Sequence, residues 1–147
     1  MMKLDLVFKN YTSQKSPGEN FFKKIIEKGA STLKIKGSLE VSVNLIGELK
    51  IRELNRKFLK KNKTTDVLSF PLKESGLKKY GILPLGDIFI CLPLSKKEAF
   101  REKISLRTKL GRLTIHGFLH LLGFDHENSE KKAEEMFKLE DRIFSKL

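Results

Sequence analysis

The chain has 147 residues, of which 30 are Lys or Arg and 18 are Asp or Glu, so its formal net charge is +12. This length predicts a single domain, 1–147, with its own hydrophobic core. A single Cys excludes an intramolecular disulfide and any zinc finger that needs two thiolate ligands. No segment approaches the ~18 apolar residues of a membrane-spanning helix, which indicates a cytoplasmic protein that does not use the membrane.

The spacing of apolar residues predicts strands and helices in mixed order. Strands are expected where apolar residues alternate with polar ones or run together before a proline, at 3–8, 39–45, 66–71 and 86–91. Helices are expected where apolar residues recur every three or four positions, between Ser16 as N-cap and Gly29, at 48–60, at 95–122 with a break near Ser105, and from Ser129 onward. Four strands and four or five helices predict an α+β fold with a roughly four-stranded mixed sheet. Cys91, at the end of the last strand, is expected to be a buried small residue rather than a reactive thiol.

All three histidines fall within eleven consecutive residues, His116-Gly-Phe-Leu-His120-Leu-Leu-Gly123-Phe-Asp-His126. His116 and His120 are four residues apart on a predicted helix, so two imidazole nitrogens can reach one ion at about 2.0–2.1 Å. Gly123 suits a left-handed C-cap, after which the chain can bring His126 back as a third ligand. Three nitrogen ligands leave one position open for water, which is typical of catalytic zinc. Asp125 is expected to orient a ligand histidine, and the metal site to lie on the central helix and the following loop.

The histidine spacing matches the metzincin protease pattern H-E-x-x-H-x-x-G-x-x-H at every position but one. The residue in place of the general-base Glu is Gly117, which has no side chain. A peptidase would therefore lack the proton transfer that typically contributes about 10²–10⁴-fold to the rate. A zinc ion can still polarise a phosphoryl oxygen and activate water, and phosphodiester hydrolysis further needs cations that neutralise phosphate.

Cationic residues are concentrated in two segments of the chain. Residues 50–63 hold seven basic residues and one acidic one, and residues 96–112 hold seven basic residues and two acidic ones. An evenly charged, solubilising surface would not show this concentration, so the pattern favours a polyanion such as RNA as partner. The candidate RNA-binding residues are Arg56, Lys60, Lys61, Lys63 and Arg107.

Together these motifs resemble the YbeY-type endoribonucleases, the bacterial rRNA maturation factors. Besides the histidine block, three blocks agree in order and spacing: Arg52-Glu-Leu-Asn55, Thr65-Asp-Val-Leu-Ser-Phe-Pro71 and Leu85-Gly-Asp-Ile88. The resemblance covers residues 40–127. It implies a cytoplasmic, zinc-dependent endoribonuclease that prefers single strands and acts in 16S rRNA 3′-end maturation and ribosome quality control, with small-subunit precursors as partners. It also implies one Zn²⁺ per chain on His116, His120 and His126, and no small-molecule cofactor.

One position departs from the family pattern. After the Leu-Asn helix, family members usually have an aromatic residue, then Arg and Gly, whereas this chain has Phe58-Leu59-Lys60. Leu59 cannot donate to a phosphate, and a lysine offers a point charge rather than a bidentate fork. Either Arg56, Lys60 or Lys61 takes over the role of the arginine, or the activity is reduced.

Two other functions stay open at this point. The first is a non-catalytic ribosome-assembly factor that binds rRNA and carries a structural zinc ion, which the missing arginine favours. The second is a metzincin-like metalloprotease with an unusual general base, against which Gly117 counts because it offers no proton-transfer group.

Overall fold

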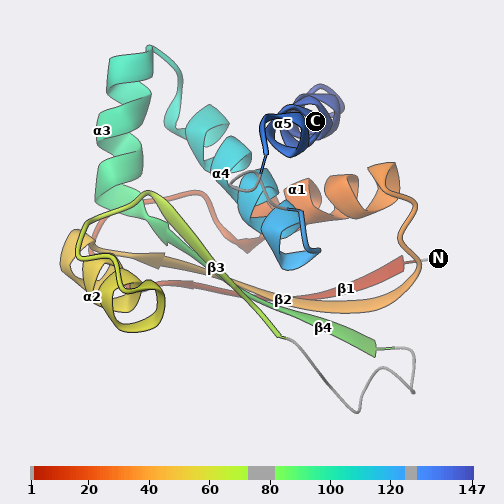
Figure 1. The fold of residues 1–147 in the computed structure, drawn as a ribbon, viewed down its shortest axis with the longest axis horizontal. Helices are drawn as coiled ribbons and strands as arrows, with labels where there is room; N and C mark the ends of the chain where they lie inside the picture. The colour runs from red at the N-terminus through yellow and green to blue at the C-terminus, as the bar shows by residue number, and fades with distance from the viewer. Residues whose placement is uncertain (1, 73–81, 125–128) are drawn as a thin grey trace.

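A four-stranded sheet forms the centre of the fold (Figure 1). The computed structural model describes residues 2–72, 82–124 and 129–147. The strands, in spatial order, are β1 (Met2–Asn10), β2 (Gly37–Ile46), β4 (Ile82–Cys91) and β3 (Val67–Pro71). The first three run parallel, and β3 is antiparallel to β4. The predicted four-stranded mixed sheet is therefore confirmed.

Five helices accompany the sheet within the described residues: α1 (Glu19–Thr32), α2 (Glu48–Leu59), α3 (Leu92–Glu102), α4 (Leu106–Leu121) and α5 (Glu130–Phe144). Figure 1 shows α1, α4 and α5 above one face of the sheet. Helix α2 packs near one end of the opposite face, where Ile51 contacts Ile46, Leu68 and Cys91. These elements form a single α+β domain, as predicted. None of the helices in the described part of the chain is long and apolar enough to cross a membrane.

Helix α4 is buried around most of its circumference because it is covered on two sides. Leu110 and Phe118 belong to the main core with the inward residues of β2 and β4. Ile115 and Leu119 belong to a second core cluster, together with Met136 and Ile143 of α5 and Ile25 of α1. A helix held between the sheet and α5 in this way is a rigid support for the side chains near its C-terminal end.

Two helix starts follow from local signals. Ser105 accepts a hydrogen bond from the amide of Thr108 and begins α4, so the predicted break near Ser105 is confirmed. Ser129 accepts a hydrogen bond from the amide of Lys132 and begins α5. In both cases the serine satisfies an amide that the first helical turn leaves without a backbone partner.

Three other predicted helix boundaries are wrong. Helix α1 begins after Gly18 rather than Ser16, because the Ser16 hydroxyl is engaged with Asn10 and with the carbonyl of Pro17. The same helix continues past Gly29 to Thr32. Helix α3 begins at Leu92, with the following proline in its first turn.

Strand β4 begins at Ile82, four residues before the predicted start. Proline is disfavoured inside a central strand, and Pro84 lies in this early part of β4. The ladder between β3 and β4 extends only to Gly86, however. Among the described residues, Pro84 lies beyond that ladder, where β4 pairs with β2, as in an edge strand.

Candidate metal centre and its cleft

Helix α4 ends directly after the second histidine. The amide of Gly123 donates to the carbonyl of His120 at 3.0 Å, and the amide of Phe124 donates to the carbonyl of Leu119 at 3.0 Å. Gly123 has a φ of +99°, in the left-handed region that favours glycine. This pair of bonds is a Schellman motif, and the predicted role of Gly123 as C-cap is confirmed. The chain therefore turns away immediately beyond the histidine pair.

His116 and His120 present their ring nitrogens to each other at this end of α4. Their Nε2 atoms lie 3.1 Å apart, and their ring centroids lie 4.6 Å apart. Two nitrogen ligands at about 2.0–2.1 Å from a tetrahedral zinc ion are about 3.3–3.4 Å apart, so the observed separation fits two imidazoles that share one ion. The chemistry of the donors fits as well, because neutral imidazole is a preferred zinc ligand.

The other two predicted members of the site, His126 and Asp125, lie outside the described residues. Within the described ranges, no group of three or more His, Cys, Asp or Glu side chains could hold a metal ion. The described part of the chain thus offers two of the three predicted ligands, and the third stays a prediction.

A carboxylate from α5 contacts the first histidine. Glu140 Oε1 is in hydrogen-bond contact with Nδ1 of His116, and their side chains are 23% and 27% exposed. The sequence interpretation missed Glu140, which lies 24 residues beyond His116. The available signal was weak: Glu140 lies four residues after the inward-facing Met136, at the border of the apolar stripe of the last helix.

The histidine pair opens into a cleft of about 650 Å³ between the end of α4, the end of α2 and the segment that joins α2 to β3. Lys61 and Lys63 line this cleft together with both histidines, and so does Leu59 at the position where the family usually has arginine. Arg56 and Lys60 are exposed near the same end of α2 but do not line the cleft. The structure thus brings together two of the five candidate RNA-binding residues with the histidine pair.

The Leu-Asn motif holds the segment that carries these lysines. Asn55 is 2% exposed, and its side-chain Nδ2 donates to the backbone carbonyl of Lys63 at 3.0 Å. The backbone carbonyl of Asn55 accepts a hydrogen bond from the amide of Lys61 at 3.3 Å. Arg52 Nε donates to Oδ1 of Asn62 at 3.0 Å. The block Arg52-Glu-Leu-Asn55 therefore fixes the loop that borders the cleft.

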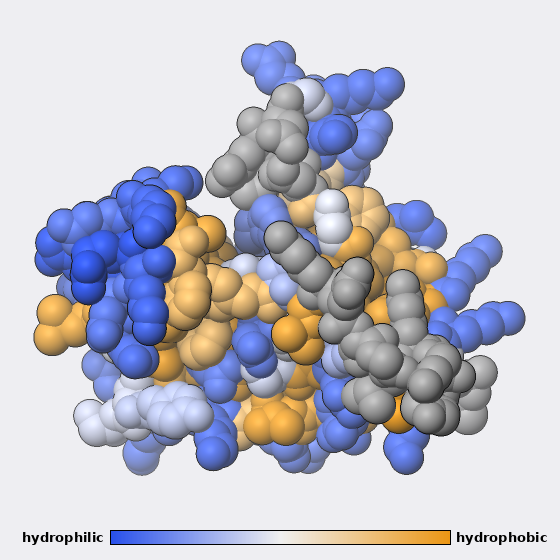
Figure 2. Space-filling view, turned by 60° about the horizontal axis from the view of Figure 1, so that its bottom comes forward, coloured by the Kyte–Doolittle hydropathy of each residue, from blue (hydrophilic) through white to orange (hydrophobic). Residues whose placement is uncertain are grey.

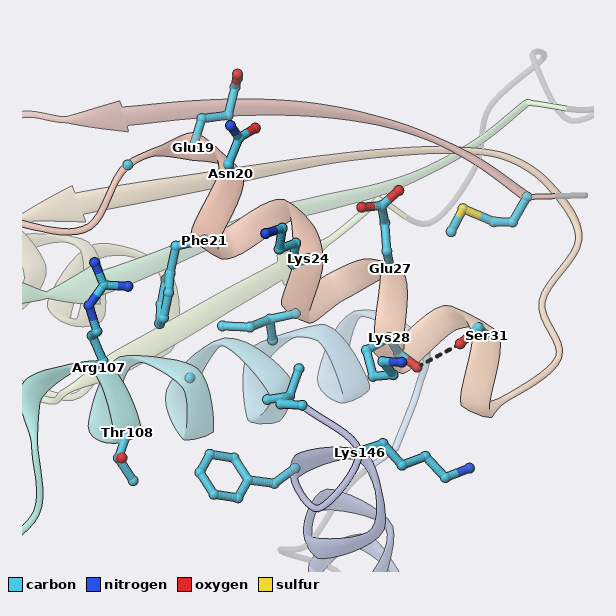
Figure 3. Close-up of a pocket in the computed structure, with 16 residues that line it drawn as sticks. Glu19, Asn20, Phe21, Lys24, Glu27, Lys28, Ser31, Arg107, Thr108 and Lys146 are labelled. Atoms are coloured by element: carbon cyan, nitrogen blue, oxygen red, sulfur yellow. Dashed lines mark hydrogen bonds between the residues drawn. The ribbon is translucent and has the colours of Figure 1, made fainter.

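Arg107 lies elsewhere. It lines a separate cavity of about 1240 Å³ between α1, α4 and the end of α5, where its guanidinium lies 5.2 Å from the ring centroid of Phe21 (Figure 3). Nine residues at about 100° each place Arg107 about 180° around α4 from His116. The structure therefore does not bring Arg107 together with the histidine pair.

The two basic segments differ in how far acidic residues neutralise them. Cations of residues 96–112 form ion pairs at 2.8–3.8 Å, namely Lys97 with Glu48, Lys109 with Glu98 and Glu102, and Arg112 with Asp141. Within the described part of the chain, no ion pair joins a cation of residues 50–63 to an acidic side chain. Figure 2 shows hydrophilic residues gathered on the left, over α2. Residues 50–63 therefore offer their positive charge beside the cleft, whereas ion pairs offset part of the charge of residues 96–112.

An acidic cluster surrounds Lys109 between α3 and α4. Burial lowers the pKa of Lys109, but the hydrogen bond with Glu102 and the charges of Glu98, Glu102 and Asp66 outweigh burial and raise the pKa above its ordinary value of 10.5. Burial and the neighbouring Asp66 raise the pKa of Glu98, while Lys109 acts in the opposite direction. Lys109 is therefore a buried structural cation that is not available to RNA.

Gly117, between the two histidines, packs directly against the sheet. A Cβ at this position would lie 2.9 Å from Cγ2 of Ile88 and 3.1 Å from Oγ of Ser69. The Ser69 hydroxyl also donates to the carbonyl of Gly117 at 3.1 Å, which ties β3 to α4. This position corresponds to the general-base Glu of the metzincin pattern, and the side chains of Ile88 and Ser69 leave no room for a glutamate there. The fold and the site define an α+β protein with an imidazole pair in a lysine-bordered cleft and a glycine at the position of the protease base.

Comparison with known proteins agrees with these features over most of the chain. A family profile described as Endoribonuclease YbeY matches residues 7–147. The chain is 45% identical over 129 residues to the endoribonuclease YbeY of Persephonella marina, with 88% of this chain and 83% of that protein covered. It is 36% identical over 127 residues to the endoribonuclease YbeY of Mesoplasma florum, with 85% of this chain and 75% of that protein covered.

The fold comparison leads in the same direction. A solution structure of a protein from Thermotoga maritima matches with a TM-score of 0.60 and 29% identity, over 98% of this chain and 87% of that one. The chain belongs to the YbeY endoribonuclease family. The predicted family resemblance is therefore confirmed.

Proposed function

We propose that this chain is a metal-dependent endoribonuclease that hydrolyses phosphodiester bonds of rRNA at a zinc ion held by His116, His120 and His126. The observation that carries the proposal is the convergence of two Nε2 atoms, 3.1 Å apart, in a cleft bordered by two lysines. When bound there, zinc would polarise a phosphoryl oxygen and a water molecule. The names of the relatives, which are endoribonucleases, support RNA as the substrate.

The residues of the chain have separate tasks in this proposal. His116 and His120 offer neutral nitrogens to the ion, and helix α4 holds them at the required spacing. Lys61 and Lys63 neutralise the phosphates of the strand that enters the cleft, since neither forms an ion pair with an acid within the described residues. The proposed substrate is a single-stranded segment of small-subunit precursor rRNA in the cytoplasm, with cleavage at the 3′ end of 16S rRNA.

The proposal is tested by incubating the purified protein with rRNA fragments in the presence and absence of a chelator, and by replacing His116 with Ala. Cleavage should be lost in both cases and should return when zinc is added back to the wild-type protein only. Equal cleavage by the His116→Ala protein would refute a metal-assisted reaction at this site.

The cleft lysines are tested against lysines on another element. Lys61→Ala and Lys63→Ala should each weaken RNA binding across sequences and reduce the slope of log K against log salt by about 1. Lys3 and Lys9 are exposed on β1, at the opposite edge of the sheet from β3, and serve as matched controls. If Lys3→Ala and Lys9→Ala reduced the slope equally, RNA would not be held at the cleft.

A second candidate is a non-catalytic rRNA-binding assembly factor with a structural zinc ion. The observation that favours it is Leu59, which is 46% exposed and lines the cleft where the family has arginine. Leu59→Arg would place a bidentate phosphate donor at this wall, so we expect faster cleavage or tighter RNA binding. An unchanged rate in a protein that already cleaves would mean that Lys61 and Lys63 suffice, and no cleavage by either protein would favour the second candidate.

A further inference from the structure

We infer that Glu140 is a positioning residue of the metal centre, so that α5 takes part in the site as well as in the core. The inference rests on the proposed metal site at His116 and His120 and concerns a residue that no sequence motif marked. It begins from the contact between Glu140 Oε1 and Nδ1 of His116, which joins the last helix of the chain to the first histidine.

The chemistry of the two groups fixes which nitrogen carries the proton. An ionised carboxylate can only accept hydrogen bonds, so Nδ1 of His116 must be the N–H that donates. A neutral imidazole has one N–H, and therefore Nε2 keeps its lone pair. Nε2 is the atom that lies 3.1 Å from Nε2 of His120. The contact with Glu140 thus selects the tautomer of His116 that can bind an ion shared with His120.

The core of the protein fixes the position of Glu140 itself. Met136 and Ile143 flank it on the same face of α5, four residues before and three residues after. Both are buried against Ile115 and Leu119 of α4, which alternate along the helix with His116 and His120. Because the same two helices carry the core contacts and the polar contact, the carboxylate is held against the histidine without a flexible loop.

Two simpler roles for Glu140 account less well for the structure. As an ordinary surface ion pair it would face a lysine or arginine, but among the described residues its only ion-pair partner is His116. As a metal ligand it would need to face the Nε2 atoms, whereas it contacts the Nδ1 side of the ring. The geometry is instead that of a carboxylate that orients a histidine ligand, and loss of such a partner typically costs 10–100-fold in metal affinity or activity.

The test is the zinc affinity of the full-length protein, measured by competition with a chromophoric chelator. Glu140→Gln keeps the size of the side chain and a neutral acceptor, and Glu140→Ala removes the partner. We expect affinity to fall in the order wild type, Gln, Ala, with about 10–100-fold lost in the Ala variant. Glu135→Gln, an exposed residue on the same helix, makes the same change in charge and should leave the affinity unchanged.

A spectroscopic readout separates positioning from general stability. In the cobalt-substituted protein, Glu140→Gln should shift the d–d absorption bands, while the thermal unfolding of the metal-free protein should match that of Glu135→Gln. Zinc affinities within twofold of wild type for both Glu140 variants would overturn the inference and leave the proposed function intact. If the wild-type protein bound no zinc, both would be overturned. If it bound zinc without cutting RNA, and the Glu140 variants bound zinc more weakly, the inference would stand and the nuclease proposal would fail.

Discussion

Replacing Gly117 by alanine tests whether close packing of α4 on the sheet positions the histidine pair. The new methyl group would lie 2.9 Å from Cγ2 of Ile88, 3.1 Å from Oγ of Ser69 and 3.3 Å from Cγ1 of Ile88. The first distance is shorter than carbon atoms tolerate, so the helix or the isoleucine must move. The helix carries His116 and His120 on either side of this position, so we expect weaker zinc binding as well as lower stability.

The magnitude follows from two opposing effects. An extra methyl group in a packed core typically costs about 1–3 kcal/mol, and Gly→Ala in a helix returns about 0.8–1.0 kcal/mol through backbone propensity. Gly117→Ala should therefore change the free energy of unfolding by about 0–2 kcal/mol in the destabilising direction. Gly111, on the same helix, is the matched control, because its Cβ would meet its nearest neighbours at 3.6 and 3.7 Å. Gly111→Ala should stabilise the protein by about 0.8–1.0 kcal/mol.

Thermal unfolding of the two variants, followed by circular dichroism, decides the question. A difference of about 1–3 kcal/mol corresponds to about 2–12 °C in Tm for a chain of this size. Trimming the neighbour with Ile88→Val in the Gly117→Ala background should recover part of the loss, which a double-mutant cycle measures. If Gly117→Ala were as stabilising as Gly111→Ala, α4 would not pack closely enough on the sheet to exclude a side chain at residue 117. The steric explanation for the glycine would then be refuted.

Two further predictions concern buried ionisable groups. Cys91 is 0% exposed and burial raises the pKa of its thiol, so a thiol reagent should modify it in denaturant but not in the native protein. The folded-state pKa of Glu98 lies above its ordinary value of 4.5, so its stabilising contribution is present below pH 4.5 and is lost as the pH rises through the folded-state pKa. Glu98→Gln should therefore have a higher Tm than wild type at pH 7. The difference in Tm between the two proteins should shrink towards pH 4. A difference in Tm that is constant with pH would contradict this reasoning.

What the sequence predicted well was local. The spacing of His116 and His120 depends only on helical geometry, and Gly123 and Ser105 act within one turn of their own positions. The family motifs added a predicted role for the histidines, that of metal ligands. Such signals need no knowledge of which helix lies beside which, and they placed His116 and His120 together on one helix, where the structure has them.

What the sequence missed depends on distant contacts. Ser16 has the composition of an N-cap, but its hydroxyl is used by Asn10, and no local rule shows this competition. The early start of β4 follows from its pairing with β2, where Ser38 lies opposite Ile82, and no local rule shows this pairing. The partnership of Glu140 with His116 needs the crossing of α5 over α4, which follows from core contacts rather than from either segment alone.

The position of Arg107 away from the histidine pair could have been predicted from the sequence. Net charge alone does not show whether a basic segment faces the site. Summing charges along residues 96–112 treats a helix as if it had one face, whereas helical geometry already puts Arg107 about 180° from His116. The same sum counts Lys109 as available, although Glu98 and Glu102 hold it in the interior. Residues 50–63 form no ion pair with an acid in the described part of the chain, and Arg52 and Asn55 hold the loop after α2 beside the cleft. A basic segment therefore indicates RNA binding only when its cations lack acidic partners and share a surface with the site, and here one of the two segments meets both conditions.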